Sequence, residues 1–201
     1  MKISCAILAG GQSRRFKRDK TVATLNGVTF TEILTKKLLS IFDDVMIISK
    51  DPKKFNFNYK NITFLKDFTD NQSPLVGIIT ALQNAKYESV FIVSADAPFL
   101  KTELVKYLST FIKDYDIVLT KIDEKINTLC GFYNKKILSD LINSYENGEY
   151  KIIDAFKNFN IKFIDDKKEI EKHDKHLLSF ININTLEDYE NAKEIAKKFG
   201  I

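Results

Sequence analysis

The chain lacks the features that mark secreted, membrane-spanning or disulfide-bonded proteins. Its two cysteines, Cys5 and Cys130, stand in apolar stretches without the spacing of a metal site or a redox motif, so we expect reduced core thiols. No apolar run reaches the roughly 18 residues of a membrane span, and Met1 leads into a strand rather than a signal peptide. These absences predict a cytoplasmic protein with no membrane partner.

The chain also has few histidines and a small net charge. The 31 Lys and Arg residues nearly balance the 27 Asp and Glu residues, and a nucleic-acid-binding protein would carry a denser basic face, so we expect no nucleic-acid partner. His173 and His176 lie in the charged segment Lys167–His176, which we interpret as a surface loop without zinc ligands. No Ser/His/Asp or Cys/His arrangement indicates covalent catalysis.

What the sequence does contain is a regular alternation of strand-like and helix-like segments. This alternation predicts a mainly parallel sheet with helices on both faces, in one domain of 201 residues without repeats or linkers. In such sheets, ligands gather at the carboxyl ends of the strands. The expected strands are Ile3–Leu8, Val45–Ser49, Ile62–Leu65, Val90–Ser94, Ile117–Thr120, Leu129–Tyr133 and Ile161–Ile164.

Four segments have the pattern of helices. Apolar residues recur at helical spacing in Thr31–Phe42 and Thr102–Lys113, and Ser73-Pro74 begins a third helix with proline at its first position. Thr185 is the expected N-cap of the last helix, with Asp188 completing a capping-box variant. The residues of that helix expected in the core are Leu186, Tyr189, Ala192, Ala196 and Phe199.

The stretch Cys5–Lys20 (CAILAGGQSRRFKRDK) joins an apolar strand to a basic loop. Gly10 and Gly11 let the backbone approach a ligand closely, with amide groups turned toward an anion. The cations that follow suit a polyphosphate: Arg14, Arg15, Lys17, Arg18 and Lys20. The loop is neither a dinucleotide fingerprint nor a Walker A loop, and an ordinary turn before a solvated basic face is the alternative.

Asp96 stands at the predicted carboxyl end of a buried strand, in Val90–Leu100 (VFIVSADAPFL). A carboxylate at this place can ligate Mg²⁺, which takes oxygen ligands from one or two carboxylates and from substrate phosphates. The alternative is a carboxylate that only caps the following turn. Because the basic loop is expected at the same edge of the sheet, we favour the metal role.

Three further features carry weaker signals. Asp67 follows the strand Ile62–Leu65, just before a helix N-terminus whose backbone can meet a base or ribose, although a well-capped core helix has the same pattern. Asn182 and Asn184 lie in FININT, expected as a strand, and are either turn-formers or part of a metal shell. Gly131 permits the close approach of backbone or ligand to its strand.

Taken in order, these stretches resemble the molybdenum cofactor guanylyltransferase family, the MobA-type nucleotidyltransferases. The stretch LAGGQSRRFKRDK follows the family pattern Leu-Ala-Gly-Gly-x-Ser-Arg-Arg-Met-Gly-x-Asp-Lys, and SPLVG, ADAPFL and FININT match its later motifs. The resemblance spans nearly the whole chain. Lys17 and Ser73 depart from it, because each replaces a family glycine, the second at a place that can alter contacts to the guanine.

The resemblance implies a fold, a reaction and a metal ion. The fold is a single doubly wound, Rossmann-like α/β nucleotidyltransferase domain over residues 1–201. The reaction transfers GMP from GTP to the terminal phosphate of the molybdopterin cofactor and releases pyrophosphate, with Mg²⁺ as the cofactor. Molybdenum-insertion proteins and apo-molybdoenzymes are the further partners that the family implies.

The resemblance also assigns roles residue by residue. Asp96 would ligate Mg²⁺, and Asp67 would help to hold the nucleotide. Lys20 would contact the phosphates. The charge and donors of the loop further suggest that Lys20 and Arg15, with the Gly10 and Gly11 amides, would stabilise the departing pyrophosphate. The residues implied at the nucleotide site are Leu8, Ala9, Gly10, Gly11, Ser13, Lys20, Asp67 and Asp96.

Other activities stay open at the level of sequence. A cytidylyltransferase or a sugar- or polyol-phosphate nucleotidyltransferase would share the fold and mechanism, although cytidylyl relatives more often read Leu-Ala-Ala-Gly. Base choice depends on hydrogen bonds inside the pocket. A nucleotide-binding regulator without turnover is a different class of function, and retention of both Lys20 and Asp96 argues against it.

Overall fold

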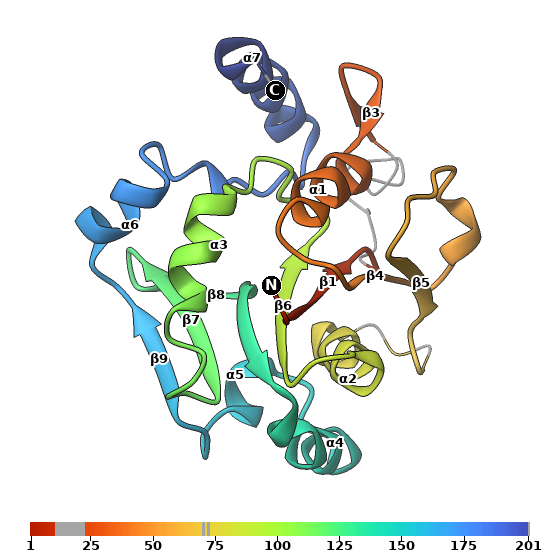
Figure 1. The fold of residues 1–201 in the computed structure, drawn as a ribbon, viewed down its shortest axis with the longest axis vertical. Coiled ribbons are helices and arrows are strands. Elements are labelled where there is room, and N and C mark those ends of the chain that lie inside the picture. Colours follow the sequence, from red (N-terminus) through yellow and green to blue (C-terminus); the bar gives the residue numbers. More distant parts are fainter. Residues whose placement is uncertain (11–22, 70, 72, 201) are drawn as a thin grey trace.

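A seven-stranded sheet with the strand order β5-β4-β1-β6-β8-β7-β9 forms the centre of the molecule (Figure 1). The computed structural model describes residues 1–10, 23–69, 71 and 73–200. β8 runs antiparallel to both of its neighbours, and the other pairs are parallel. The strands are β1 (Ser4–Leu8), β4 (Val45–Ser49), β5 (Ile62–Lys66), β6 (Ser89–Ser94), β7 (Ile117–Ile122), β8 (Lys125–Asn134) and β9 (Ile161–Ile164).

Helices cover both faces of this sheet (Figure 1). One face packs against α1 (Phe30–Leu39), α3 (Thr102–Ser109) and α6 (Lys167–His173). The other packs against α2 (Pro74–Asn84), α4 (Leu138–Glu146) and α5 (Ile152–Ala155). The long C-terminal α7 (Leu186–Phe199) packs on the small hairpin of β2 (Thr24–Leu25) and β3 (Val28–Thr29). Short 3-10 turns occur at Pro52–Lys54, Lys135–Ile137 and Leu178–Phe180.

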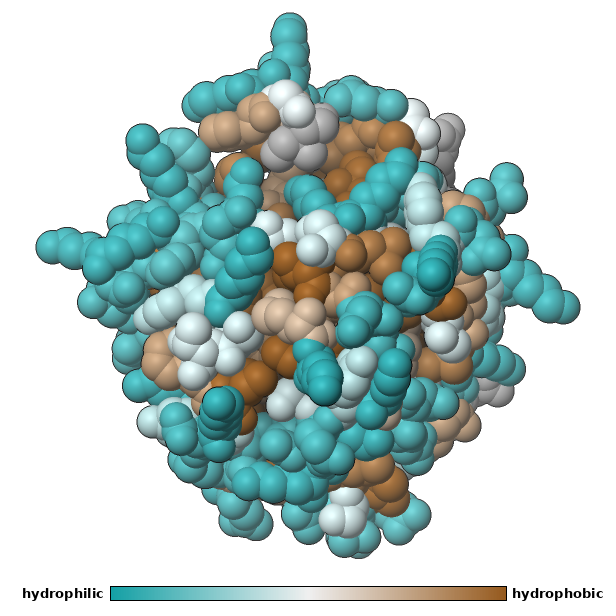
Figure 2. Space-filling view, in the orientation of Figure 1, coloured by the Kyte–Doolittle hydropathy of each residue, from teal (hydrophilic) through white to brown (hydrophobic). Residues whose placement is uncertain are grey.

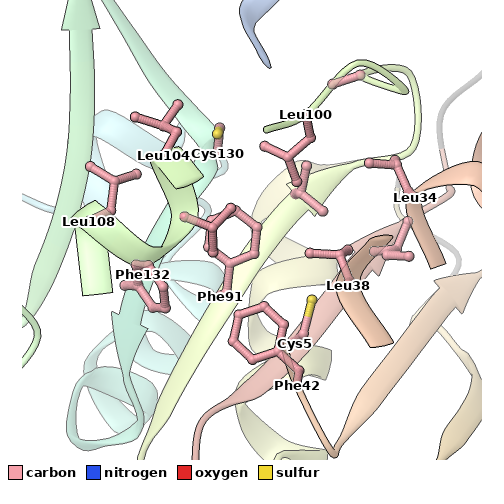
Figure 3. Packing of buried hydrophobic residues seen from close by; sticks show 14 of the residues in the cluster. Cys5, Leu34, Leu38, Phe42, Phe91, Leu100, Leu104, Leu108, Cys130 and Phe132 are labelled. Carbon is pink, nitrogen blue, oxygen red and sulfur yellow. The ribbon is translucent and has the colours of Figure 1, made fainter. Parts of the chain in front are cut away.

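Every residue of β1 and β4 is buried, as expected for parallel strands that helices cover on both sides. In the core beneath α1 and α3, the ring of Phe91 lies 5.9 Å from that of Phe42 and 5.0 Å from that of Phe132 (Figure 3). Cys5 and Cys130 are buried free thiols in the same cluster. Burial raises the pKa of both, that of Cys130 to about 12, so these are protonated packing residues.

The structure confirms the mainly parallel sheet and all the expected strands except the one over FININT. That segment instead forms the 3-10 turn Leu178–Phe180 and an irregular connection to α7. The expected surface loop Lys167–His176 is also wrong in part, because Asp166 accepts hydrogen bonds from the Lys168 and Glu169 amides and begins α6.

At the last helix, the capping box of Thr185 and Asp188 is confirmed. Leu186, expected in the core, is 52% exposed, because it sits in the first turn before the helix meets its packing partners. The hairpin β2-β3 was missed, although Asn26-Gly27, both at positive φ, is the typical two-residue turn of a hairpin.

The face of the molecule seen in Figure 2 is largely polar. Figure 2 shows hydrophilic residues over most of the visible face, with hydrophobic residues between them in a band across the centre. Among the described helices, none has the length and apolar character needed to cross a bilayer.

Candidate active site

The carboxyl ends of four parallel strands meet at one edge of the sheet. Leu8 at the end of β1 pairs with Ser94 at the end of β6, and Ser49 at the end of β4 pairs with Lys66 in β5. The segments that follow β1, β5 and β6 therefore leave the sheet side by side. This topology brings Gly10, Asp67 and Asp96 to the same edge, although they are far apart in the sequence.

The turn that leaves β1 is held between its two neighbouring strands. The Ala9 amide donates to the Ile48 carbonyl at 2.8 Å, and the Leu8 carbonyl accepts from the Ala95 amide at 3.0 Å. Leu8 and Ala9 are buried, and Gly10 is half-buried. Four residues expected at the site lie outside the described part of the chain: Gly11, Ser13, Arg15 and Lys20.

Asp67 lies directly against this turn. A Cβ atom added to Gly10 would stand 3.0 Å from the Asp67 carboxylate, so a glycine is what lets the two approach. The Asp67 amide donates to the Ser49 carbonyl at 3.3 Å, which fixes the residue just after β5. The pKa of Asp67 is raised, because burial has a larger effect than the nearby Lys50 ammonium, which acts in the opposite direction. The Asp67 carboxylate is thus a partly desolvated hydrogen-bond acceptor beside the backbone of Gly10, which has no side chain to cover it.

Ser73 caps α2 next to this edge. Its hydroxyl accepts from the Leu75 amide at 3.2 Å and donates to the Tyr150 carbonyl at 2.9 Å. Pro74 occupies the first helical position, where no amide donor is needed. The serine that stands where the family pattern has glycine therefore ties the connection between α4 and α5 to the start of α2.

Asp96 sits in a tight turn after β6 and is 9% exposed. Its carbonyl accepts from the Ile183 amide at 2.9 Å, and the Ala97 amide donates to the Ser94 carbonyl at 3.2 Å. From α1, the Lys37 ammonium donates to the Pro98 carbonyl at 2.8 Å. The backbone of the turn that carries this carboxylate is thus held at three points.

A polar cavity of about 300 Å³ opens beside Asp96. It is lined mainly by groups with oxygen or amide atoms, which suits a hard cation and a phosphate-bearing ligand. The expected metal ligand Asp96 and the two asparagines of FININT are brought together there. The polar lining residues are Ser94, Asp96, Lys125, Asn127, Thr128, Ser179, Asn182 and Asn184.

Sequence reasoning missed the contribution of β8 to this cavity. The pairing with β7 shifts from Leu119–Gly131 to Thr120–Asn127, so Thr128, Leu129 and Cys130 form a bulge that lines the cavity. The Tyr133 hydroxyl donates to the Thr128 carbonyl and holds the bulge. Neither apolar alternation nor spacing signals such a bulge.

The described residues contain no group of three or more His, Cys, Asp or Glu side chains that could hold a metal ion. A site built on Asp96 would therefore take its other ligands from neutral oxygens and from the substrate. This is the usual arrangement for Mg²⁺, which binds through one or two carboxylates together with substrate phosphates. The donor set around the cavity fits that ion.

Lys37 is expected to make stability depend on pH. Burial lowers its pKa to about 8, with Lys101 acting in the same direction and Asp174 in the other. Between about pH 8 and pH 10 the unfolded chain binds more protons at Lys37 than the folded chain, so the contribution of Lys37 to stability rises with pH.

Lys37→Met removes this dependence. We expect the stability of the variant relative to the parent to be about 2 kcal/mol more favourable at pH 7 than at pH 10. Urea unfolding of both proteins at the two pH values measures the difference, in which the titrations of tyrosine and cysteine cancel. An equal difference at both values would contradict the burial of the ammonium.

Three comparisons with known proteins bear on this site. Residues 5–159 match the MobA-like NTP transferase domain. A probable molybdenum cofactor guanylyltransferase of Clostridium perfringens strain 13 is 34% identical over 194 residues, 95% of this chain and 96% of that protein.

Two solved structures share the fold. Molybdopterin-guanine dinucleotide biosynthesis protein A of Archaeoglobus fulgidus is 27% identical, with a TM-score of 0.84 over 98% of this chain and 100% of that one. Rv0371c of Mycobacterium tuberculosis, solved as a complex with manganese, is 11% identical, with a TM-score of 0.66 over 96% and 97%, and shares the fold alone. Sequence and fold together place this chain in the MobA-like NTP transferase family, among the molybdenum cofactor guanylyltransferases.

Proposed function

We propose that this protein transfers GMP from GTP to the terminal phosphate of the molybdopterin cofactor and releases pyrophosphate. The observation that carries the proposal is the placement of the buried Asp96 carboxylate between the β1 turn and a polar cavity, in a chain of this family. A nucleotide on one side of Asp96 and an acceptor on the other would meet at this carboxylate.

The nucleotide belongs on the side of the β1 turn. Gly10 has no side chain to obstruct a nucleoside, and Leu8 and Ala9 lead into it from β1. Asp67 offers a carboxylate that can accept hydrogen bonds from the nucleoside. The basic loop continues directly from Gly10. We assign Gly11, Ser13, Arg15 and Lys20 to the phosphates on the strength of the family motif.

Asp96 would hold Mg²⁺, with help from neutral oxygens of the cavity. When bound, the ion would neutralise charge on the phosphate oxygens. Lys20 and Arg15 would stabilise the charge that develops on the departing pyrophosphate.

The chemistry is an in-line displacement at the α-phosphorus. A terminal phosphate oxygen of the acceptor forms the new P–O bond, and the bond from the α-phosphorus to the bridging oxygen breaks, so pyrophosphate leaves with the electron pair. The attacking phosphate is already anionic and needs no general base. The task of the chain is to position the two reactants and balance their charge.

The acceptor belongs in the cavity on the far side of Asp96. Asn127, Asn182 and Asn184 present amides that can bind its polar groups, and Lys125 also lines the cavity. In the cell we expect the reaction in the cytoplasm, with product passing to molybdenum-insertion proteins or apo-molybdoenzymes.

GTP labelled with radioactive phosphorus tests the proposed bond cleavage. Label at the α-phosphorus should move to the molybdopterin acceptor, and label at the γ-phosphorus should appear only in pyrophosphate. Transfer of the γ-label to the acceptor would make the protein a kinase and overturn the proposal. Release of α-label as free GMP, with no labelled acceptor, would make it a hydrolase.

Gly10→Ala is expected to raise the KM for GTP by about tenfold, since displacing a binding group by a few tenths of an ångström misaligns the nucleotide. The added methyl would stand 3.0 Å from the Asp67 carboxylate and push it aside. Steady-state kinetics of a double-mutant cycle with Asp67→Ala checks the cause. Without the carboxylate, the alanine should cost little more, and an unchanged tenfold effect in that background would contradict the explanation.

A further inference from the structure

One buried carboxylate has no part in the mechanism above. Asp174 follows α6 and is 2% exposed. Its carboxylate oxygens accept from the Leu178 amide at 3.0 Å and the Ser179 amide at 2.7 Å. Burying a carboxylate is costly unless hydrogen bonds or an opposite charge compensate, and here the two amide bonds and the attraction of the Lys37 ammonium both do so.

The turn that Asp174 holds is joined to the turn that carries Asp96. Leu177 adopts positive φ, and the 3-10 turn Leu178–Phe180 follows it. The Ser179 hydroxyl then accepts from the Lys101 amide at 2.9 Å, at the end of the segment that leads from Asp96 to α3. Ser179 also lines the acceptor cavity.

The chain after this turn is fixed at two more points. The Ile183 amide donates to the Asp96 carbonyl at 2.9 Å, between the two asparagines that line the cavity. The Asn184 and Thr185 amides both donate to the Asp188 carboxylate at 2.9 Å. We call Leu177–Thr185 the strap, because it has no regular strand pairing and is held at Asp174, Asp96 and Asp188.

We propose that Asp174 is a positioning residue for the acceptor: it fixes the strap so that Ser179, Asn182 and Asn184 face the cavity beside Asp96. The inference rests on the proposed function, because the acceptor is the molybdopterin phosphate. Asp174 does not touch the substrate. Its loss acts on the acceptor side of the site and leaves the β1 turn and Asp67, where the nucleotide belongs, in place.

The chain offers a matched control for a merely structural effect. Asp166, at the start of α6, also accepts from two backbone amides, those of Lys168 at 3.0 Å and Glu169 at 3.3 Å. Asp166 is the N-cap of α6 and is not among the residues that line the cavity. Loss of either pair of carboxylate–amide bonds should weaken one end of α6, and an effect that only destabilises the fold should weaken the binding of GTP and of the acceptor alike.

The experiment compares Asp174→Asn and Asp174→Ala with Asp166→Ala. In Asp174→Asn one oxygen becomes an NH₂ group that faces an amide donor, so one bond is lost with little change in volume. We expect both Asp174 variants to raise the equilibrium Kd and the KM for the acceptor by about tenfold or more. The Kd and KM for GTP should stay within about twofold of the parent values. Asp166→Ala should leave the Kd and KM for both substrates unchanged.

Amide hydrogen exchange gives a readout independent of turnover. Strap amides should exchange faster in the Asp174 variants, and those of β1 and α2 should not. Equal losses for GTP and acceptor, or an effect no larger than that of Asp166→Ala, would overturn the positioning role. A parent protein without nucleotidyl transfer would instead refute the proposed function, and the ratio of acceptor Kd values between variant and parent would still decide the role of Asp174.

Discussion

Asp96→Ala is expected to lower the rate of nucleotidyl transfer by about 10³-fold or more, the size of effect seen when a group that stabilises transition-state charge is removed. The carboxylate is 9% exposed at the end of β6, beside a cavity of about 300 Å³, and it is the proposed ligand of Mg²⁺. Its turn is held by backbone bonds to Ser94 and Ile183 that do not use the side chain. The fold should therefore survive the substitution.

Two controls separate chemistry from folding. Asp140→Ala removes an exposed carboxylate from α4 and should leave turnover unchanged. Thermal unfolding of Asp96→Ala should differ little from that of the parent. Turnover within about tenfold of the parent, measured by pyrophosphate release, would remove Asp96 from the mechanism.

Gly131→Ala is expected to cost about 3 kcal/mol of stability, a large part of the total for a protein of this size. A Cβ atom at Gly131 would stand 2.5 Å from both the Val118 carbonyl oxygen and the Leu119 side chain. The carbonyl belongs to the backbone of β7, so relief requires the β7–β8 pairing to move. Gly131 thus permits the close approach of the β7 backbone to the β8 backbone.

Gly148→Ala is the matched control for Gly131→Ala. Gly148 has φ +81° and nothing within 4 Å of an added Cβ, so alanine there should cost only about 1 kcal/mol through its backbone conformation. Urea unfolding of the two variants gives the comparison. If Gly131→Ala costs no more than Gly148→Ala, the backbones of β7 and β8 do not pack closely at this glycine.

The strands could be predicted because a parallel sheet buried on both faces requires continuous apolar runs. Val45–Ser49 and Ile161–Ile164 were expected with the bounds that the structure has. The position of Asp96 could be predicted for the same reason, since it follows such a run and ligands bind at the carboxyl ends of parallel strands. Asn182 and Asn184 gave only a weak signal, because what brings them to Asp96 is the Ile183–Asp96 backbone bond rather than a pattern.

The parts that could not be predicted depend on tertiary contacts. The bulge at Thr128–Cys130 comes from a shift in pairing with β7, and single-sequence periodicity carries no information on pairing. α6 was not predicted, because its charged segment shows little apolar periodicity, although Asp166 is a typical N-cap. Asp174 reads as one more surface carboxylate in that segment, and its burial is evident only in the structure.

The most direct test of the account is Mg²⁺-dependent pyrophosphate release with molybdopterin cofactor and, in turn, GTP, CTP, ATP and UTP. We predict pyrophosphate release with GTP, little with the other three nucleotides, and none without the acceptor. A preference for CTP would keep the fold and the displacement mechanism but contradict the guanylyl assignment. No release with any nucleotide, from folded protein and a competent acceptor, would contradict the proposed reaction itself.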